Sequence, residues 1–209
     1  MSESYKTVRS EADAEYIVKK SRFIGHIRPV TTQSEALDFI AAVSKKYWDA
    51  THNVYAYILR ENGVKRFSDD GEPQGTAGIP VLDVLEKSGV TDCAVVVTRY
   101  FGGIMLGAGG LVRAYSHSAS IALEAGGIVT RALCNSYTVN CDYGFYGKLN
   151  SLIPENGGII DDAVFEDCVK ISFHIPVILA GRFIEVLTDV SNGKVSAEKT
   201  GEFFADADI

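Results

Sequence analysis

The sequence lacks the features that mark secreted, membrane or metal-cluster proteins. Its four cysteines form no C-x-x-C pair and lie far apart, so they are expected to be reduced core residues and not a disulfide framework or a zinc site. Apolar runs such as 94–97 are far shorter than the ~20 residues that cross a membrane. Residues 1–11 include acidic side chains where a secretory signal would have a basic start followed by an apolar run. We expect a cytoplasmic protein without a membrane segment.

An excess of positive charge is also missing. The chain has 20 Lys and Arg against 27 Asp and Glu, a net charge of −7, which argues against a protein that coats nucleic acid. The imbalance is local, because residues 1–134 carry 15 basic and 15 acidic side chains whereas residues 135–209 carry 5 and 12. A phosphate-binding surface is therefore expected on the first part of the chain.

What the chain does have is a globular composition, with 46% hydrophobic residues over 209 positions, enough for two domains. In the first 134 residues, alternation and helical spacing predict strands at 5–9, 15–18, 22–28, 53–60, 64–67 and 93–98, and helices at about 34–47, 80–88 and 109–125. The caps expected for these helices include Thr32 or Ser34 at the first and Gly89 after the second.

From residue 136 the pattern reads β-α-β-β-α-β, the ferredoxin-like arrangement of four strands with two helices on one face. The expected strands are 136–142, 158–165, 168–175 and 194–200, and the expected helices are 143–153 and 177–190. The sequence thus predicts an α+β protein of two domains, residues 1–134 and 135–209, with the boundary near 130–135.

A glycine-rich loop between two arginines, Arg99 to Arg113, joins the apolar strand at 93–98 to a helix. Backbone N–H groups and a helix dipole attract anions in this context. The loop matches neither nucleotide motif: Val112 stands where a dinucleotide fingerprint has its third glycine, and Ala108 and Gly109 replace the Lys and Ser/Thr of a P-loop. The alternative is that the glycines only permit tight turns and close packing. An arginine at the end of an apolar strand favours a ligand-binding loop, because it needs an anion or a carboxylate.

A second cluster places Asp69, Asp70 and Glu72 in a turn-rich loop. These carboxylates could bind a divalent metal, but the ligand spacing of a calcium loop is missing. We expect instead that they cap nearby backbone or pair with Arg99 or Arg113, and we expect no cofactor.

His52 is the histidine whose neighbours are polar enough for a role as acid or base, although a hydrogen-bonded structural histidine is the alternative. The basic segment 19–23, which contains Lys20 and Arg22, is compatible with contacts to a phosphate backbone. It is equally compatible with a solvated start of a strand.

Several motifs together resemble the YigZ/IMPACT family over essentially the whole chain. They are Lys20-Ser-Arg-Phe-Ile24, Ala50-Thr-His-Asn53, Ser68-Asp-Asp-Gly-Glu-Pro73 with Gly75-Thr-Ala-Gly78, and Thr98-Arg-Tyr-Phe-Gly-Gly103 with Leu106-Gly107 and Gly109-Gly-Leu-Val-Arg-Ala-Tyr115. One departure is Met105, where some relatives carry a lysine.

The resemblance implies a first domain folded like the C-terminal domain of a small-subunit ribosomal protein, and a second like the last domain of elongation factor G. Eukaryotic members regulate translation by competing for the ribosome-associated activator of an initiation-factor kinase, with an additional N-terminal domain that this chain is expected to lack. What the resemblance carries over is a fold associated with translation and nucleic acid.

Three functions remain open at this point: a protein that binds RNA or the ribosome, a hydrolase or transferase that acts on a phosphorylated substrate, and an adaptor for a protein partner in translation. We expect binding rather than catalysis. The expected ligand-binding or nucleic-acid-binding residues are Lys20, Arg22, Arg99, Gly102, Gly103, Gly107, Gly109, Arg113 and Tyr115, and the candidate catalytic residues are His52, Asp69, Asp70 and Glu72.

Overall fold

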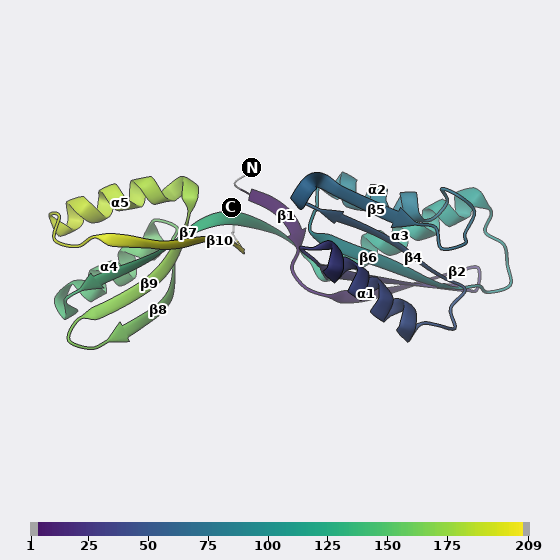
Figure 1. The fold of residues 1–209 in the computed structure, drawn as a ribbon. Coiled ribbons are helices and arrows are strands. Elements are labelled where there is room, and N and C mark those ends of the chain that lie inside the picture. The colour runs from purple at the N-terminus through teal and green to yellow at the C-terminus, as the bar shows by residue number, and fades with distance from the viewer. Residues whose placement is uncertain (1–3, 207–209) are drawn as a thin grey trace. The chain divides into compact units, whose positions relative to one another are not determined.

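The computed structural model describes residues 4–206, which divide into two compact units. The first unit comprises residues 5–129, and the second continues from Thr130. Each unit has its own β-sheet, helices and hydrophobic core (Figure 1). The predicted two-domain α+β fold is confirmed. Within residues 4–206, no helix has both the length and the apolar character needed to cross a membrane.

The first unit is built on an antiparallel sheet in the order β2-β3-β6-β4-β5. Its strands are β2 (Ala12–Val18), β3 (Ser21–Pro29), β4 (His52–Leu59), β5 (Val64–Ser68) and β6 (Cys93–Tyr100). Its helices are α1 (Gln33–Lys46), α2 (Gly78–Ser88) and α3 (Ala108–Gly126), with a short 3-10 turn, η1 (Glu61–Gly63), between β4 and β5. The short strand β1 (Ser4–Val8) adds Val8 to the core.

The central strand β6 is apolar on both faces because helices cover both sides of the sheet. Its odd-numbered residues from Cys93 to Val97 pack in the core formed with α2 and α3, whereas Ala94 and Val96 pack in the core formed with α1. The alternation of side chains along a strand therefore directs Arg99 toward α2 and α3, and Thr98 toward α1.

Capping signals fix where the first helices begin and end. Thr32 accepts a hydrogen bond from the backbone N–H of Glu35, whose side chain returns to the backbone of Thr32, a capping box at the start of α1. Gly89 ends α2 in the left-handed conformation at φ 67°. Both caps were expected from the sequence, and helix α2 begins two residues earlier than predicted.

The second unit has the element order β-α-β-β-α-β. Its elements are β7 (Ile128–Cys141), α4 (Tyr143–Glu155), β8 (Ile159–Phe165), β9 (Val169–Pro176), α5 (Val177–Ser191) and β10 (Ala197–Asp206). The strands pair antiparallel in the order β10-β7-β9-β8, and both helices pack in one core with the sheet. This is the topology expected of a ferredoxin-like domain.

Strand β7 begins at Ile128, eight residues before the predicted start at 136. Its extension pairs with β10, from Arg131 opposite Asp206 onward, and β10 in turn runs to Asp206 and not to 200. Pairing between distant segments therefore sets both ends. The boundary expected at 134/135 and the division that the structure shows, between Val129 and Thr130, both lie within β7.

Candidate functional site

The site is centred on Arg99, whose position follows from the register of three strands. Arg99 stands opposite His52 of β4 and opposite Phe23 of β3, so all three share the face that α2 and α3 cover. Arg99 is 5% exposed, and its guanidinium lies between the rings of Phe23 and Phe101, at 5.4 and 5.5 Å. A cation this deeply buried requires compensation by hydrogen bonds or charge.

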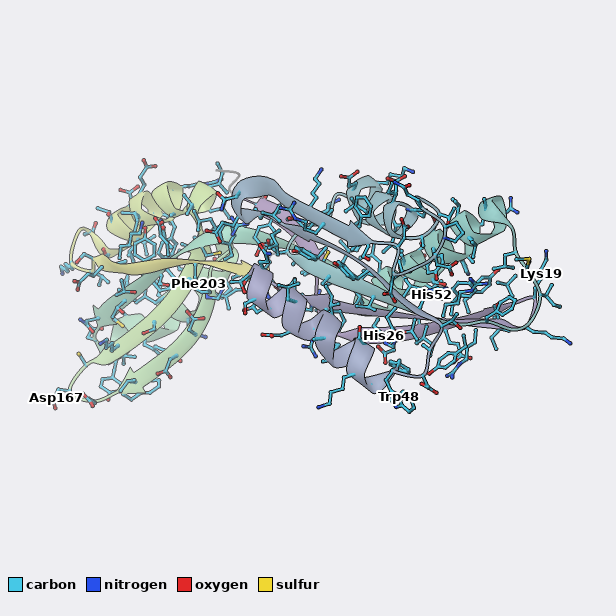
Figure 2. The ribbon with its side chains drawn as sticks, turned by 45° about the vertical axis from the view of Figure 1, so that its right-hand side comes forward. Lys19, His26, Trp48, His52, Asp167 and Phe203 are labelled. Carbon is cyan, nitrogen blue, oxygen red and sulfur yellow. The ribbon has the colours of Figure 1, made fainter. Side chains whose placement is uncertain are left out.

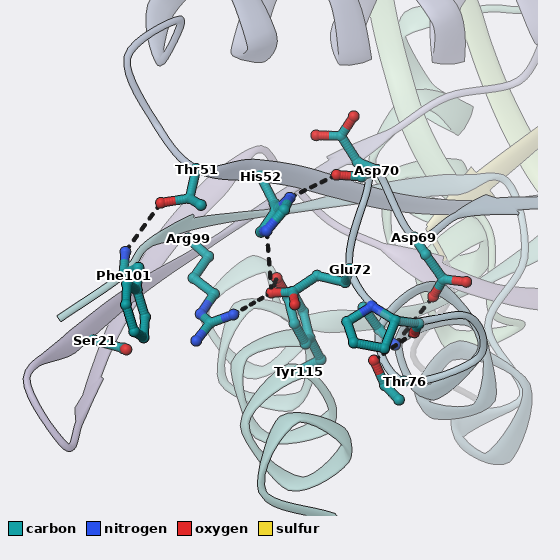
Figure 3. A network of polar contacts seen from close by, with 12 residues as sticks. Ser21, Thr51, His52, Asp69, Asp70, Glu72, Thr76, Arg99, Phe101 and Tyr115 are labelled. Atoms are coloured by element: carbon teal, nitrogen blue, oxygen red, sulfur yellow. Dashed lines mark hydrogen bonds and ion pairs between the residues drawn. The ribbon is translucent and has the colours of Figure 1, made fainter. Parts of the chain in front are cut away.

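Glu72 supplies that compensation at the centre of a polar network (Figure 3). Its Oε1 accepts a hydrogen bond of 2.5 Å from Nη1 of Arg99 and one of 2.8 Å from the hydroxyl of Tyr115. Tyr115 is fully buried on α3, and its burial, together with the Glu72 carboxylate, raises the pKa of its phenol. The network thus holds a charged pair and a neutral donor away from water.

His52 points into the same network with a defined proton position. Its Nδ1 lies 2.6 Å from the backbone carbonyl of Asp70, which can only accept, so Nδ1 carries a hydrogen. Its Nε2 faces Oε1 of Glu72 at 3.8 Å. The side chain of Asp70 accepts a hydrogen bond from the backbone N–H of Asn53 and thereby fixes the loop against β4.

Asp69 binds backbone N–H groups of the acidic loop and does not line the cavity. Its carboxylate accepts backbone N–H groups of Gly75, Ala77 and Gly78 at 2.8, 3.1 and 2.8 Å, which satisfies the start of α2. Glu72 and Asp69 therefore have different tasks: one pairs with Arg99 and the other caps backbone. Both tasks were among the expectations for this loop.

A cavity of about 420 Å³ opens above this network. Its polar part consists of Thr51, His52, Glu72 and Arg99, and its apolar part includes Phe101 and Leu111. The remaining lining residues are Gly71, Pro73, Met105, Leu106, Gly107 and Ala108. Cavities of this volume with an apolar wall and a few convergent polar groups are typical of small-ligand sites.

Two glycines shape the loop that forms one wall of the cavity. A Cβ on Gly102 would lie 2.0 Å from the backbone of Lys20, so the loop passes directly against the turn between β2 and β3. Figure 2 shows Lys19 in this turn. Gly107 has φ 72° at the N-cap of α3, a conformation that favours glycine. Gly103 also has a positive φ, of 81°, while Gly109 lies exposed in the first turn of α3.

Not all of the predicted residues meet at the cavity. Arg113 is exposed on α3, and Asp69 caps α2; neither is among the lining residues. Arg22 is half exposed and pairs with Glu15 at 2.7 Å, and strand alternation places it on the opposite face of the sheet from Arg99. Lys20 lies in the turn that Gly102 contacts. The loop thus contributes one arginine to the cavity, not two.

Comparison with known proteins identifies a family for both units. Residues 19–123 match the family described as Impact N-terminal domain, and residues 139–194 match a domain of unknown function, DUF1949. The IMPACT family member YvyE of Bacillus subtilis is 41% identical over 97% of this chain and 93% of its own length. The chain belongs to the IMPACT family.

Other IMPACT relatives match to different extents. YigZ of Escherichia coli is 34% identical over 85% of this chain and 89% of its own length. Protein IMPACT of Bos taurus is 36% identical, but over only 43% of this chain and 29% of its own length. A solved structure, titled "Crystal structure of an hypothetical protein", is 31% identical with a TM-score of 0.62 and covers 96% of this chain and 99% of its own. Every residue that lines the cavity lies within the segment that matches the IMPACT N-terminal domain.

Sequence reasoning missed the apolar wall of the cavity and Thr51. Phe101, Leu106 and Leu111 follow or flank glycines in the predicted loop, but their periodicity does not distinguish a cavity wall from core packing. The signal that could have found Phe101 is its position two residues after Arg99. Within residues 4–206, no cluster of three or more His, Cys, Asp or Glu side chains is arranged to hold a metal ion.

Proposed function

We propose that this IMPACT-family chain binds RNA, free or within the ribosome, through the cavity of its first unit, and that this binding serves a regulatory role in translation in the cytoplasm. The observation that carries the proposal is the pairing of an uncapped helix start with a buried arginine at one cavity. Helix α3 has no side-chain cap and no acidic residue in its first turn, and Gly107 and Ala108 line the cavity together with Arg99. Such helix starts attract phosphate groups.

The surroundings of the cavity support a nucleic-acid ligand. Lys19 and Lys20 lie in the turn whose backbone meets Gly102, so their positive charges flank the loop. Phe101 is 48% exposed and offers a ring on which a base can stack. The acidic residues 135–209, with 5 basic and 12 acidic side chains, would disfavour non-specific contact with nucleic acid on the second unit.

The proposal is tested with the full chain and a single-stranded RNA, by measuring affinity as a function of salt concentration. In the variant Lys19→Asn/Lys20→Asn the fold is retained, because both lysines have positive φ (45° and 65°) and asparagine tolerates that conformation. We expect weaker binding and a shallower slope of log K against log [salt], by about one per lysine.

The matched control removes the same charge from the second unit, as Lys148→Gln/Lys170→Gln, both exposed. We expect this pair to leave the slope unchanged. Absence of RNA binding at low salt, or an equal effect of both double variants, contradicts the proposal.

A second candidate function, hydrolysis or group transfer on a phosphorylated substrate, is favoured by the geometry of His52. With the hydrogen on Nδ1 held by the carbonyl of Asp70, Nε2 of His52, a residue that lines the cavity, is the ring nitrogen left to act as a general base. This candidate predicts release of phosphate or nucleotide by the wild-type chain and its loss in His52→Gln with ligand affinity retained. A wild-type chain that releases no product from phosphomonoesters or phosphodiesters excludes it.

A further inference from the structure

The first turn of α3, from which Gly107, Ala108 and Leu111 line the cavity, contains a set of unsatisfied donors. The first bond of the helix runs from the N–H of Leu111 to the carbonyl of Gly107, so the N–H groups of Ala108, Gly109 and Gly110 have no partner within the helix. The starts of α1 and α4 are capped by Thr32 and Asp142. Residues 107–110 are three glycines and an alanine, so none of them has a bulky or polar side chain that could cover these N–H groups.

Arg99 provides a second and independent unsatisfied donor at the same place. Its Nη1 bonds to Glu72, but within residues 4–206 neither its Nε nor its Nη2 has a hydrogen-bond partner, although the residue is only 5% exposed and lines the cavity. An unpaired buried donor is costly, and more so when it is charged. An anion in the cavity would relieve this cost.

The size and wall of the cavity indicate what is attached to the anion. About 420 Å³ is more than an inorganic phosphate fills, and it is far too little for a nucleic-acid duplex. The apolar part of the lining includes Phe101, Leu106 and Leu111, together with Pro73. Flat, largely apolar groups such as a nucleobase fit against such a wall.

We propose that the cavity binds a nucleoside that carries a terminal phosphate, with the phosphate at the first turn of α3 and Arg99, and the base against the apolar wall. This inference rests on the proposed RNA binding and specifies that the cavity holds the phosphorylated end of the RNA. The donors available are the N–H groups of the first turn of α3 and the guanidinium of Arg99; a phosphomonoester has three unesterified oxygens to accept from them, whereas an internal phosphodiester has two. The monoester also carries more negative charge.

The same chemistry occurs in a free nucleoside monophosphate and at a phosphorylated RNA end, and the experiment separates them. Affinities of the full chain are measured for adenosine 5′-monophosphate, adenosine, inorganic phosphate, and one 12-nucleotide RNA with either a 5′-phosphate or a 5′-hydroxyl. We expect each phosphorylated nucleoside or RNA to bind at least tenfold more tightly than its unphosphorylated form, and inorganic phosphate to bind more weakly than the monophosphate.

The variant Gly109→Asp provides the decisive comparison. A Cβ at Gly109 meets no atom within 4 Å, so the side chain fits, and its carboxylate adds a negative charge at the helix start, which repels a phosphate and stabilises the helix. We expect an unchanged or higher melting temperature and at least a tenfold loss of affinity for the phosphorylated probes. Gly147→Asp in α4 makes the same substitution at an equally open position of the second unit and is expected to leave binding unchanged.

The outcomes distinguish this inference from the proposed function. If RNA binds equally with either 5′ end, or if Gly109→Asp binds as the wild type does, the inference is wrong and RNA binding stands. If the monophosphate binds and responds to Gly109→Asp but neither RNA binds, the terminal-phosphate site stands and the RNA function is wrong. If no phosphorylated probe binds more tightly than its unphosphorylated form, the inference is overturned.

Discussion

At the scale of the residue, Glu72 joins three elements through one carboxylate oxygen. It compensates the buried guanidinium of Arg99 on β6 and accepts from Tyr115 on α3. Glu72→Gln leaves the arginine without its counter-charge, so we expect a loss of about 3–5 kcal/mol in the free energy of unfolding. Tyr115→Phe removes one hydrogen bond to a charged group and is expected to cost about 1.5–3 kcal/mol.

Urea unfolding followed by circular dichroism measures both values. The test is whether Glu72→Gln lowers the free energy of unfolding more than Tyr115→Phe does. The two variants are comparable because each changes a fully or nearly fully buried side chain with little change in volume. A Tyr115→Phe variant that is less stable than Glu72→Gln would show that the ion pair does not dominate the network.

Cys93 is a residue whose titration couples to stability in alkaline solution. Its complete burial raises the pKa of its thiol from 9.0 to about 12. Between these pH values the unfolded chain releases the proton and the folded chain keeps it. The free energy of unfolding therefore falls as the pH rises, by up to about 1.4 kcal/mol per pH unit. Burial of Tyr115 acts in the same direction above pH 10, because its pKa is also raised.

The variant Cys93→Ala isolates the contribution of this thiol. We expect a flatter dependence of the urea midpoint on pH between 9 and 12 than in the wild type, with the other groups whose pKa is raised, Tyr57 and Tyr115 among them, left to account for the remaining slope. Identical slopes in the two proteins would mean that Cys93 ionises in the folded state as readily as in the unfolded chain.

At the scale of the element, a glycine of the β6–α3 loop and a glycine in the first turn of α3 differ in the space around them. Gly102→Ala forces a Cβ to within 2.0 Å of the Lys20 backbone, and we expect it to destabilise the protein by about 1–3 kcal/mol or more. Gly109→Ala places a methyl group in open space on a helix and is expected to stabilise by up to about 1 kcal/mol. Thermal unfolding of the two single variants gives the comparison, and a change of the same sign in both would contradict this geometry.

Some ends of helices and strands were predictable from the sequence, and others were not. Local signals such as Thr32 before α1 and Gly89 after α2 identified helix ends, because a cap acts on its own helix. The early start of β7 and the late end of β10 escaped prediction, because they depend on each other across some 70 residues. The secondary-structure propensity of one segment carries no information about the distant strand with which it pairs.

The candidate site was predictable to a similar degree. The alternation of side chains along β6 decides which face of the sheet Arg99 occupies. The charge pattern alone did not show which of Asp69, Asp70 and Glu72 pairs with it. In the structure Arg99 pairs with Glu72, and Arg113 lies on the exposed side of α3. The proposed similarities of the two domains to a ribosomal protein and to elongation factor G stay predictions.

At the scale of the whole molecule, the two units have separate hydrophobic cores. Leu85 and Leu149 are both fully buried, one in the core between α2, α3 and the first sheet and the other in the core of the second unit. We expect each Leu→Ala variant to cost about 2–5 kcal/mol. Calorimetry should show each variant lowering a different transition, and a single transition that responds equally to both would contradict independent cores.

The proposed phosphate site at the first turn of α3 is tested most directly by the amide resonances of its glycines. In a titration of the full ¹⁵N-labelled chain with the 5′-phosphorylated RNA, we predict large shifts for the N–H groups of Gly109 and Gly110 and for Nε–H of Arg99. The amide resonances of glycines in the second unit, such as Gly147 and Gly201, should not shift. Binding that shifts the second unit and leaves Gly109, Gly110 and Arg99 unchanged would contradict the claim.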